Sequence, residues 1–199
     1  MRKHSEAKDT NGVISNASDR MVAQDYERTM LACFTAFFVQ AIINNFLPLL
    51  FLTFQEQFGI RLEQIALLIS FNFLIQLAVD FLSIFFVDRV GYKPSLVVSQ
   101  ILATTGLIAV AILPRLMSNV FAALLIAVFI YAVGGGLIEV LTSTVVDATP
   151  SPKKGALMSL THSFHCWGHV IVVLVSTLLF SLFGLANWPY LALRWALVP

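Results

Sequence analysis

Charged residues are scarce in this sequence of 199 residues, at 12% of the total, whereas hydrophobic residues make up 58%. This balance lies far from that of soluble proteins. The apolar residues also occur in long uninterrupted blocks, and a soluble core would instead require short periodic stripes. The composition therefore argues against a soluble fold and predicts a chain that folds in lipid.

Cysteine is nearly absent, since the sequence contains only Cys33 and Cys166. Both fall inside apolar segments, which is typical of small buried hydrophobic side chains and excludes a disulfide framework. The formal net charge is only +1, and the basic residues form no patch suited to a nucleic acid. Nucleic-acid binding is therefore not expected. Near its start, the sequence has no short apolar segment followed by a small-residue cleavage site, so a cleaved secretory signal is not predicted.

The chain divides into a polar start and a series of apolar blocks. Residues 1–28 are poor in large apolar side chains, so we expect a disordered cytoplasmic tail. Five blocks follow, each near or above the roughly 20 residues that cross a bilayer as a helix. We place them at 29–54, 64–87, 95–114, 120–146 and 156–183. The predicted fold is an all-α membrane bundle over residues 29–184, with an outward loop and the start of an incomplete sixth span at 185–199.

The distribution of lysine and arginine predicts the orientation of this bundle, because cytoplasmic loops retain these residues. Nine of the twelve lie in the tail and in the connections 88–94 and 148–155. Only three lie in the connection 55–63, the connection 115–119 and the segment after the fifth span. We therefore expect a multi-pass protein of the cell membrane with a cytoplasmic amino terminus.

Polar residues inside the spans carry the functional signal, because a central charge costs about 2.5 to 3.5 kcal/mol on insertion scales and seldom faces lipid. Asn72, Gln76 and Asp80 recur every four residues in the second predicted span, so they share one helix face. Glu139 begins a second polar face in the fourth span. For Asp80, nearer the cytoplasmic end, pairing with Arg89 or another basic group is the alternative to a functional role.

Further polar residues occur in two other spans, namely Asn44, Asn45, His162, His165 and His169. The histidines share one helix face, since they recur at spacings of three and seven. Together with Gln76 and Glu139, the asparagines and the last two histidines are predicted to lie within a turn or two of mid-membrane. Polar groups from four helices at one level are typical of the central solute cavity of a transporter.

Each of these positions also has a structural interpretation. Asn72 and Gln76 can form hydrogen bonds between helices, worth under about 1 to 2 kcal/mol each, or bind a solute directly. Glu139 can be a neutral hydrogen-bonded acid, or it can load and release the proton that coupling to a gradient requires. The histidine row can converge on a cation, but neither cysteine nor carboxylate completes a ligand set with it, so no metal or other cofactor is predicted. The glycine run 134–136 indicates close helix packing.

The connection after the second predicted span reads Asp-Arg-Val-Gly-Tyr-Lys-Pro, from Asp88 to Pro94. It resembles the signature between the second and third helices of the major facilitator superfamily. Gly91 permits a tight turn there, and Pro94 suits the first turn of the next helix. The resemblance implies a conformational signature loop formed by Asp88, Arg89, Gly91 and Lys93.

Two more segments, Gly-Gly-Gly-Leu-Ile-Glu at 134–139 and His-Ser-Phe-His-Cys-Trp-Gly at 162–168, resemble fucose-permease-like sugar transporters. In that family a glutamate after such a glycine-rich segment binds sugar and takes part in proton symport, which implies this role for Glu139. The resemblance places His162 and His165 at the sugar cavity, and Asn44 and Asn45 resemble the paired asparagines of the first helix. The acidic residue of that helix has no counterpart here, so the coupling ion stays open.

The sequence therefore predicts the amino-terminal half of a secondary transporter. We expect it to move a small polar solute, a sugar on the family resemblance, by alternating access, with a proton as the candidate coupling ion and a carboxy-terminal half as the missing partner. No enzymatic activity is expected. A non-transporting membrane interaction protein is the first alternative, and an intramembrane metal-dependent enzyme that uses the histidines is the second.

Overall fold

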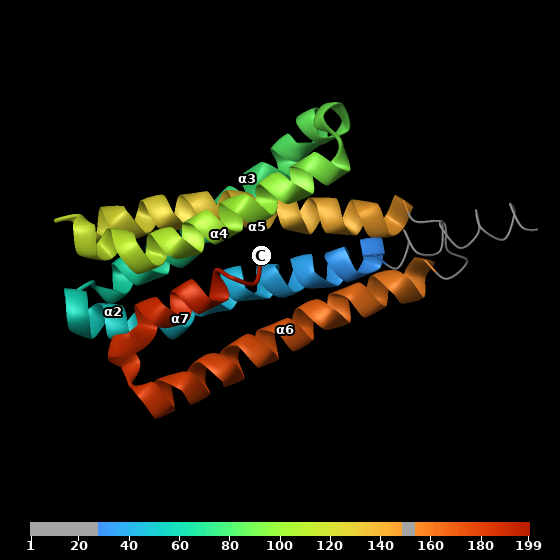
Figure 1. Cartoon of the computed structure of the whole chain (residues 1–199). Coiled ribbons are helices and arrows are strands. Elements are labelled where there is room, and N and C mark those ends of the chain that lie inside the picture. The colour runs from blue at the N-terminus through green and yellow to red at the C-terminus, as the bar shows by residue number, and fades with distance from the viewer. Residues whose placement is uncertain (1–27, 149–153) are drawn as a thin grey trace, which may run out of the picture.

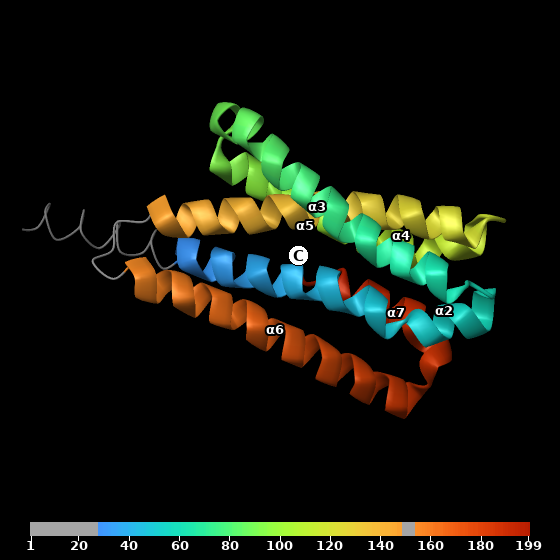
Figure 2. The ribbon, with the colours of Figure 1, turned by 180° about the vertical axis from the view of Figure 1, so that it is seen from behind.

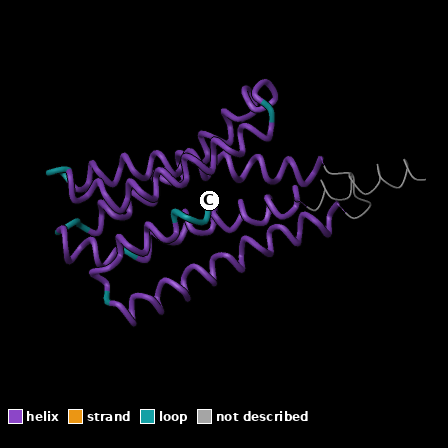
Figure 3. Tube along the Cα trace, in the orientation of Figure 1, coloured by secondary structure: helices purple, strands orange, loops and turns teal. Residues whose placement is uncertain are grey.

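The computed structural model describes residues 28–148 and 154–199, which are almost entirely helical, with no strand among them (Figure 3). Within these residues, five helices are long and apolar enough to cross a membrane. They are the first helix (Arg28–Leu49), α3 (Leu62–Val90), α4 (Tyr92–Leu116), α5 (Val120–Ala148) and α6 (Lys154–Phe183). The predicted all-helical membrane bundle of about five spans is therefore confirmed. The predicted tail, apart from Arg28, lies outside the described residues.

The first predicted span, 29–54, is interrupted near its end. Pro48 has no N–H group, so one hydrogen bond of the helical ladder is missing. The N–H of Leu50 then bonds to the carbonyl of Leu47 at 2.9 Å, three residues back instead of four. A separate short helix, α2 (Phe51–Phe58), follows this break. The prediction of one continuous helix here is wrong because hydropathy alone does not register the proline.

The first helix lies in the centre of the bundle, with α6 on one side and α5 on the other (Figures 1 and 2). On the α6 side, the rings of Phe34 and Phe164 stack with their centroids 4.2 Å apart. One turn further on α6, a methyl group added at Gly168 would meet Cβ of Ala41 at 2.9 Å, so only a glycine fits at this crossing. The first helix can therefore contribute side chains to both of its neighbours.

Helix α5 approaches α3 and α4 through the predicted glycine run. A methyl group at Gly134 would lie 2.7 Å from the carbonyl oxygen of Ser99 on α4. At Gly136, a methyl group would lie 2.9 Å from Cβ of Val79 on α3. Small residues allow helix backbones to come this close in a membrane, where packing replaces the hydrophobic effect. The interpretation of the glycine run as a packing device is confirmed.

The last described segment folds back onto the bundle. A 3-10 turn (Leu185–Asn187) leads into α7 (Trp188–Trp195). The indole of Trp188 is fully buried, and its Nε1 donates a hydrogen bond to Oε1 of Gln57 at 2.9 Å. At the other end of α7, Nε1 of Trp195 donates to Oγ of Ser176 at 3.0 Å. These bonds tie α7 to both α2 and α6.

Candidate functional site

A hydrogen-bonded network of side chains joins the first helix to α3 and α5. Nε2 of Gln40 on the first helix donates to Oε1 of Gln76 on α3 at 3.0 Å. The same nitrogen donates to Oε2 of Glu139 on α5 at 3.3 Å. A single amide group therefore connects three helices.

Two asparagines extend the network along the first helix and α3. Nε2 of Gln76 donates to Oδ1 of Asn44 and to Oδ1 of Asn72, both at 2.9 Å. Nδ2 of Asn72 donates to Oδ1 of Asn44 at 3.3 Å. Asn44 lies four residues after Gln40, and Gln76 four residues after Asn72. Each pair therefore shares a helix face, and the two faces meet.

The network is buried at its centre and open at one end. The exposed fractions of Gln40, Gln76 and Asn72 are 1%, 4% and 5%. Asn44 is half-buried, whereas Glu139 is exposed. Buried amides are costly unless their polar atoms are paired, which explains why the three most buried members bond to one another. Since the carboxyl group of Glu139 lies at the surface of the bundle, the network links the core to that surface.

Gly135 lets α5 close over this network. A methyl group at this position would lie 3.0 Å from Oε1 of Gln40 and 3.4 Å from Nε2 of Gln76. A side chain at residue 135 would therefore require both amides to shift. The three successive glycines therefore have three neighbours: α4 at the first, the amide network at the second and α3 at the third.

A small cavity adjoins the asparagine end of the network. Its volume is about 10 Å³, and it is lined by Ile43, Asn44, Leu47, Pro48, Ile69, Asn72 and Tyr131. That is close to the space that one water molecule occupies. Larger cavities lie around α7, where Tyr190 and Arg194 line one of about 210 Å³ against α6 and one of about 490 Å³ against α4. None of these larger cavities includes a residue of the amide network.

The remaining predicted site residues lie outside the network. Nδ2 of Asn45 bonds to the carbonyl of Ala41 within its own helix at 2.8 Å. His162 is exposed, with its ring 5.4 Å from that of Phe37. His165 places Nδ1 3.3 Å from the carbonyl oxygen of Phe37. Asn45 and the histidines therefore do not bond to the network in this conformation.

The histidine row itself forms a local pair. Nε2 of His165 and Nε2 of His169 lie 3.0 Å apart, so one ring donates a hydrogen bond and the other accepts it. In the described part of the chain, no group of three or more histidine, cysteine, aspartate or glutamate side chains could hold a metal ion. Of the two, His165 connects α6 to the first helix through the carbonyl of Phe37.

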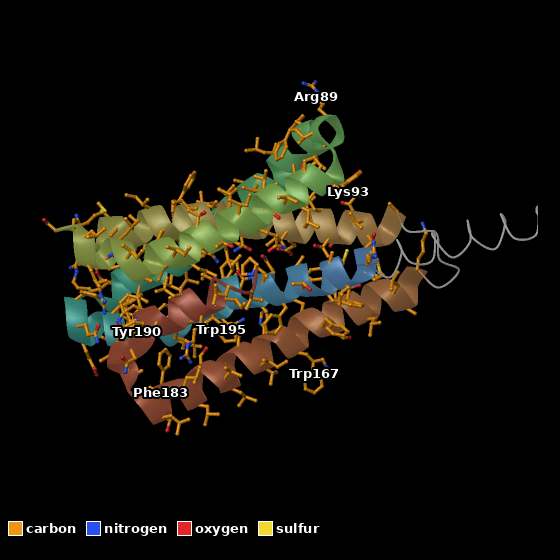
Figure 4. The ribbon with its side chains drawn as sticks, in the orientation of Figure 1. Arg89, Lys93, Trp167, Phe183, Tyr190 and Trp195 are labelled. Atoms are coloured by element: carbon orange, nitrogen blue, oxygen red, sulfur yellow. The ribbon has the colours of Figure 1, made fainter. Side chains whose placement is uncertain are left out.

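Sequence reasoning misses one residue of the network. Gln40 is absent from the predicted site, although its position four residues before Asn44 in an apolar span was an available signal. Pairing of Asp80 with Arg89, one of the two roles that the sequence left open, does not occur: Arg89 is exposed and points away from the bundle (Figure 4). One carboxyl oxygen of Asp80 is buried without a hydrogen-bond partner, and the group interacts electrostatically with Glu139.

The signature segment forms the turn between α3 and α4. Gly91 has φ of 92° and ψ of 152°, a conformation that favours glycine. The side chains of Arg89 and Lys93 are exposed and extend outward (Figure 4). The side chain of Asp88 lies outside the described residues. The backbone geometry thus agrees with the tight turn predicted at Gly91.

A family model described as Major Facilitator Superfamily matches residues 29–198. No curated protein and no solved structure gave a significant match. The matched range contains all five candidate spans except for the first residue of the first, together with α2, α7 and the whole amide network.

Proposed function

Since the chain belongs to the Major Facilitator Superfamily and is a multi-pass membrane transporter protein, we propose that it moves a small polar solute, a sugar, by alternating access with proton coupling. The observation that carries this proposal is the network of four amides in an apolar helical bundle, which ends at a carboxyl group on the surface of the bundle. Lipid rejects such groups, so a polar cluster at this depth is expected to serve transport.

Depth supports a central position for the network. Gln40 lies near the middle of the first helix (Arg28–Leu49), and Gln76 lies at the middle of α3 (Leu62–Val90). Solute sites of secondary transporters lie near the bilayer midplane, where both sides of the membrane can reach them in turn. We therefore place the solute site beside this network.

The chemistry of the network favours a neutral, hydroxyl-rich solute. Amide groups both donate and accept hydrogen bonds, as sugar hydroxyls do. Both N–H groups of Asn44 and one N–H of Asn72 are left over after the bonds within the network are counted. Because they are unpaired within the network, these groups are the ones that we assign to solute contact. Gln76, whose amide is fully engaged, acts as their support.

Glu139 is the group to which we assign proton coupling. Its carboxyl group is exposed on the surface of the bundle and accepts a hydrogen bond from Gln40. A charged carboxylate is expelled from hydrocarbon, so this surface must face water or protein. We propose that it lines the central pathway and faces a second helical bundle across it. The positive-inside bias supports a cell-membrane location with a cytoplasmic amino terminus.

Transport into proteoliposomes tests this function. The full-length protein is reconstituted with an inward proton gradient, and uptake of radiolabelled fucose, other hexoses and a pentose is measured. We expect accumulation of at least one sugar, abolished in Glu139→Gln, while sugar exchange without a gradient persists. Glu63→Gln is the matched control, because Glu63 is exposed and pairs only with Arg61 at the helix end, at 3.8 Å. Undiminished accumulation in Glu139→Gln would remove this residue from the coupling mechanism, and no uptake of any sugar would refute the substrate class.

A further inference from the structure

The amide nitrogen of Gln40 donates in both directions of the network, to Glu139 and to Gln76. An ionised carboxylate only accepts hydrogen bonds, so Gln40 must present N–H to Glu139. The second N–H of the same nitrogen points to Gln76, whose oxygen accepts it. Gln76 must then present its own N–H groups to Asn44 and Asn72. The charge of Glu139 thus fixes the orientation of every amide up to the small cavity.

Gln76 is saturated in this arrangement, whereas Gln40 is not. The oxygen of Gln76 accepts one hydrogen bond and its nitrogen donates two. The oxygen of Gln40 is buried and has no hydrogen-bond partner. A buried acceptor without a donor is unfavourable, so this oxygen can accept a hydrogen bond from a donor group that comes within reach.

Space around the Gln40 amide is provided by Gly135. The unpaired oxygen lies against this residue, where even a methyl group would approach it to 3.0 Å. Rotation of the terminal amide about its last bond exchanges the oxygen and the larger NH₂ group. Hydrogen at position 135 leaves the room that this exchange needs.

We propose that Gln40 and Gln76 are positioning residues that transmit protonation of Glu139 to Asn44 by reversing the direction of the hydrogen-bond chain. This inference rests on the proposed role of Glu139. A hydronium ion gives its proton to the carboxylate, which leaves water and a neutral carboxyl group. The O–H of that group donates to Oε1 of Gln40 after its amide rotates, and no covalent bond of the amides changes.

The reversal then passes along the chain by rotation alone. Gln40 now presents oxygen to Gln76, which rotates to donate its N–H and turns its own oxygen toward the asparagines. Asn44 and Asn72 rotate in response, and both donate to that oxygen. Asn44 also donates to Oδ1 of Asn72, and it presents its carbonyl where its N–H groups were. The cavity beside Asn44 therefore changes from a hydrogen-bond donor to an acceptor when Glu139 is protonated. Solute contact and proton binding are coupled by this change.

Other titratable groups surround the network and must be separated from it. They are Asp80 on α3, Tyr131 on α5, which lines the small cavity, and His165 on α6, whereas those of α4 lie at its ends. Cys33 on the first helix packs in a separate cluster with Met30 and Val146. Asp80 is the one that interacts electrostatically with Glu139. An Asp80→Asn variant therefore separates the carboxyl signal of Asp80 from that of Glu139.

Infrared difference spectroscopy between low and high pH tests the relay without any solute. The full-length protein in lipid carries ¹³C in its glutamine side-chain amides, and the proton is the only ligand. We expect the C=O band of a protonated carboxyl group together with isotope-shifted glutamine bands. The part of the carboxyl band that comes from Glu139 and the glutamine bands should both vanish in Glu139→Gln and persist in Asp80→Asn. In Gly135→Ala the carboxyl band should remain while the glutamine bands are largely lost, and Gly155→Ala, which has open space around it, should match the unmodified protein.

Two outcomes would overturn the relay. A carboxyl band without glutamine bands in the unmodified protein means that Glu139 binds a proton but the amides do not respond, so the proposed function survives alone. A carboxyl band that is unchanged in Glu139→Gln means that Glu139 does not take up the proton, which removes its coupling role and the relay together. Because the decisive comparison uses isotope labels on the unmodified chain, it does not depend on whether a variant folds.

Discussion

Nε2 of Gln40 lies 3.3 Å from Oε2 of Glu139, although 99 residues separate the two in the chain. The contact exists because the first helix lies against α5, and because glycine at position 135 leaves space for the amide. The site is therefore a product of helix packing, and changes in packing and changes in polarity should affect it separately.

Replacement of Gln40 by leucine should destabilise the bundle. The oxygen of Gln76 would lose its donor in a buried setting, and an unpaired buried group costs about 1 to 3 kcal/mol. The free energy of unfolding in mixed detergent micelles measures this loss. Thr35→Val is the matched control, because Thr35 bonds only to the carbonyl of Leu31 in its own exposed turn. Equal stability of the two variants would contradict a structural role for Gln40.

Replacement of Gly136 by alanine should separate α3 from α5. The new methyl group would meet Cβ of Val79 at 2.9 Å and the carbonyl oxygen of Gln76 at 3.0 Å. Backbone cannot move aside as a flexible side chain does, so we expect a loss of about 1 to 3 kcal/mol from overpacking. Thermal melting in detergent measures it. Gly155→Ala has nothing within 4 Å of the new methyl group and should leave the melting temperature unchanged or slightly raised.

Hydropathy was sufficient to predict the spans because each is a long apolar block, and lipid requires such blocks to be helical. It was insufficient at Pro48, where the missing N–H interrupts the helix. The tight turn at Gly91 was predictable, since a glycine between two polar helix ends indicates a backbone conformation with positive φ. These features are local, so the sequence contains them directly.

The candidate site was only half predictable, because it depends on which helix faces meet. Asn72, Gln76 and Asn44 were identified from their spacing and depth, and they do come together. Asn45 was grouped with Asn44, yet successive residues of a helix point about 100° apart, so both could not face the network. Gln40, which has the right spacing, was overlooked.

The histidine row illustrates the same limit. Its spacing predicts a shared face, and His165 and His169 do contact each other. The orientation of α6 about its own axis cannot be inferred from the sequence. In the structure this orientation turns His165 toward the backbone of Phe37 and leaves His162 exposed. Whether these residues approach a solute in another conformation stays a prediction.

Replacement of Gln57 by leucine should weaken the attachment of α7. The buried indole N–H of Trp188 would lose its acceptor, with an expected cost of about 1 to 3 kcal/mol. Thermal melting measures the loss, and Trp188 fluorescence in a chain whose other tryptophans are phenylalanine reports whether its surroundings change. Gln55→Leu is the control, since Gln55 is also exposed on α2. An equal or larger effect in the control would show that the hydrogen bond from Trp188 to Gln57 does not hold α7 in place.

The orientation proposed from the positive-inside bias predicts opposite accessibility at the two ends of α3. Arg61 precedes this helix and Lys93 follows it, and both side chains are exposed. In a chain without Cys33 and Cys166, we expect a membrane-impermeant maleimide to label Arg61→Cys on intact cells. Lys93→Cys should be labelled only after the membrane is permeabilised, because two connections rich in basic residues lie on its side. If Lys93→Cys is labelled on intact cells and Arg61→Cys is protected, the bundle has the opposite orientation in the membrane. The cavity beside Asn44 would then adjoin the cytoplasmic half of the membrane, and the direction of the proton gradient in the transport assay would have to be reversed.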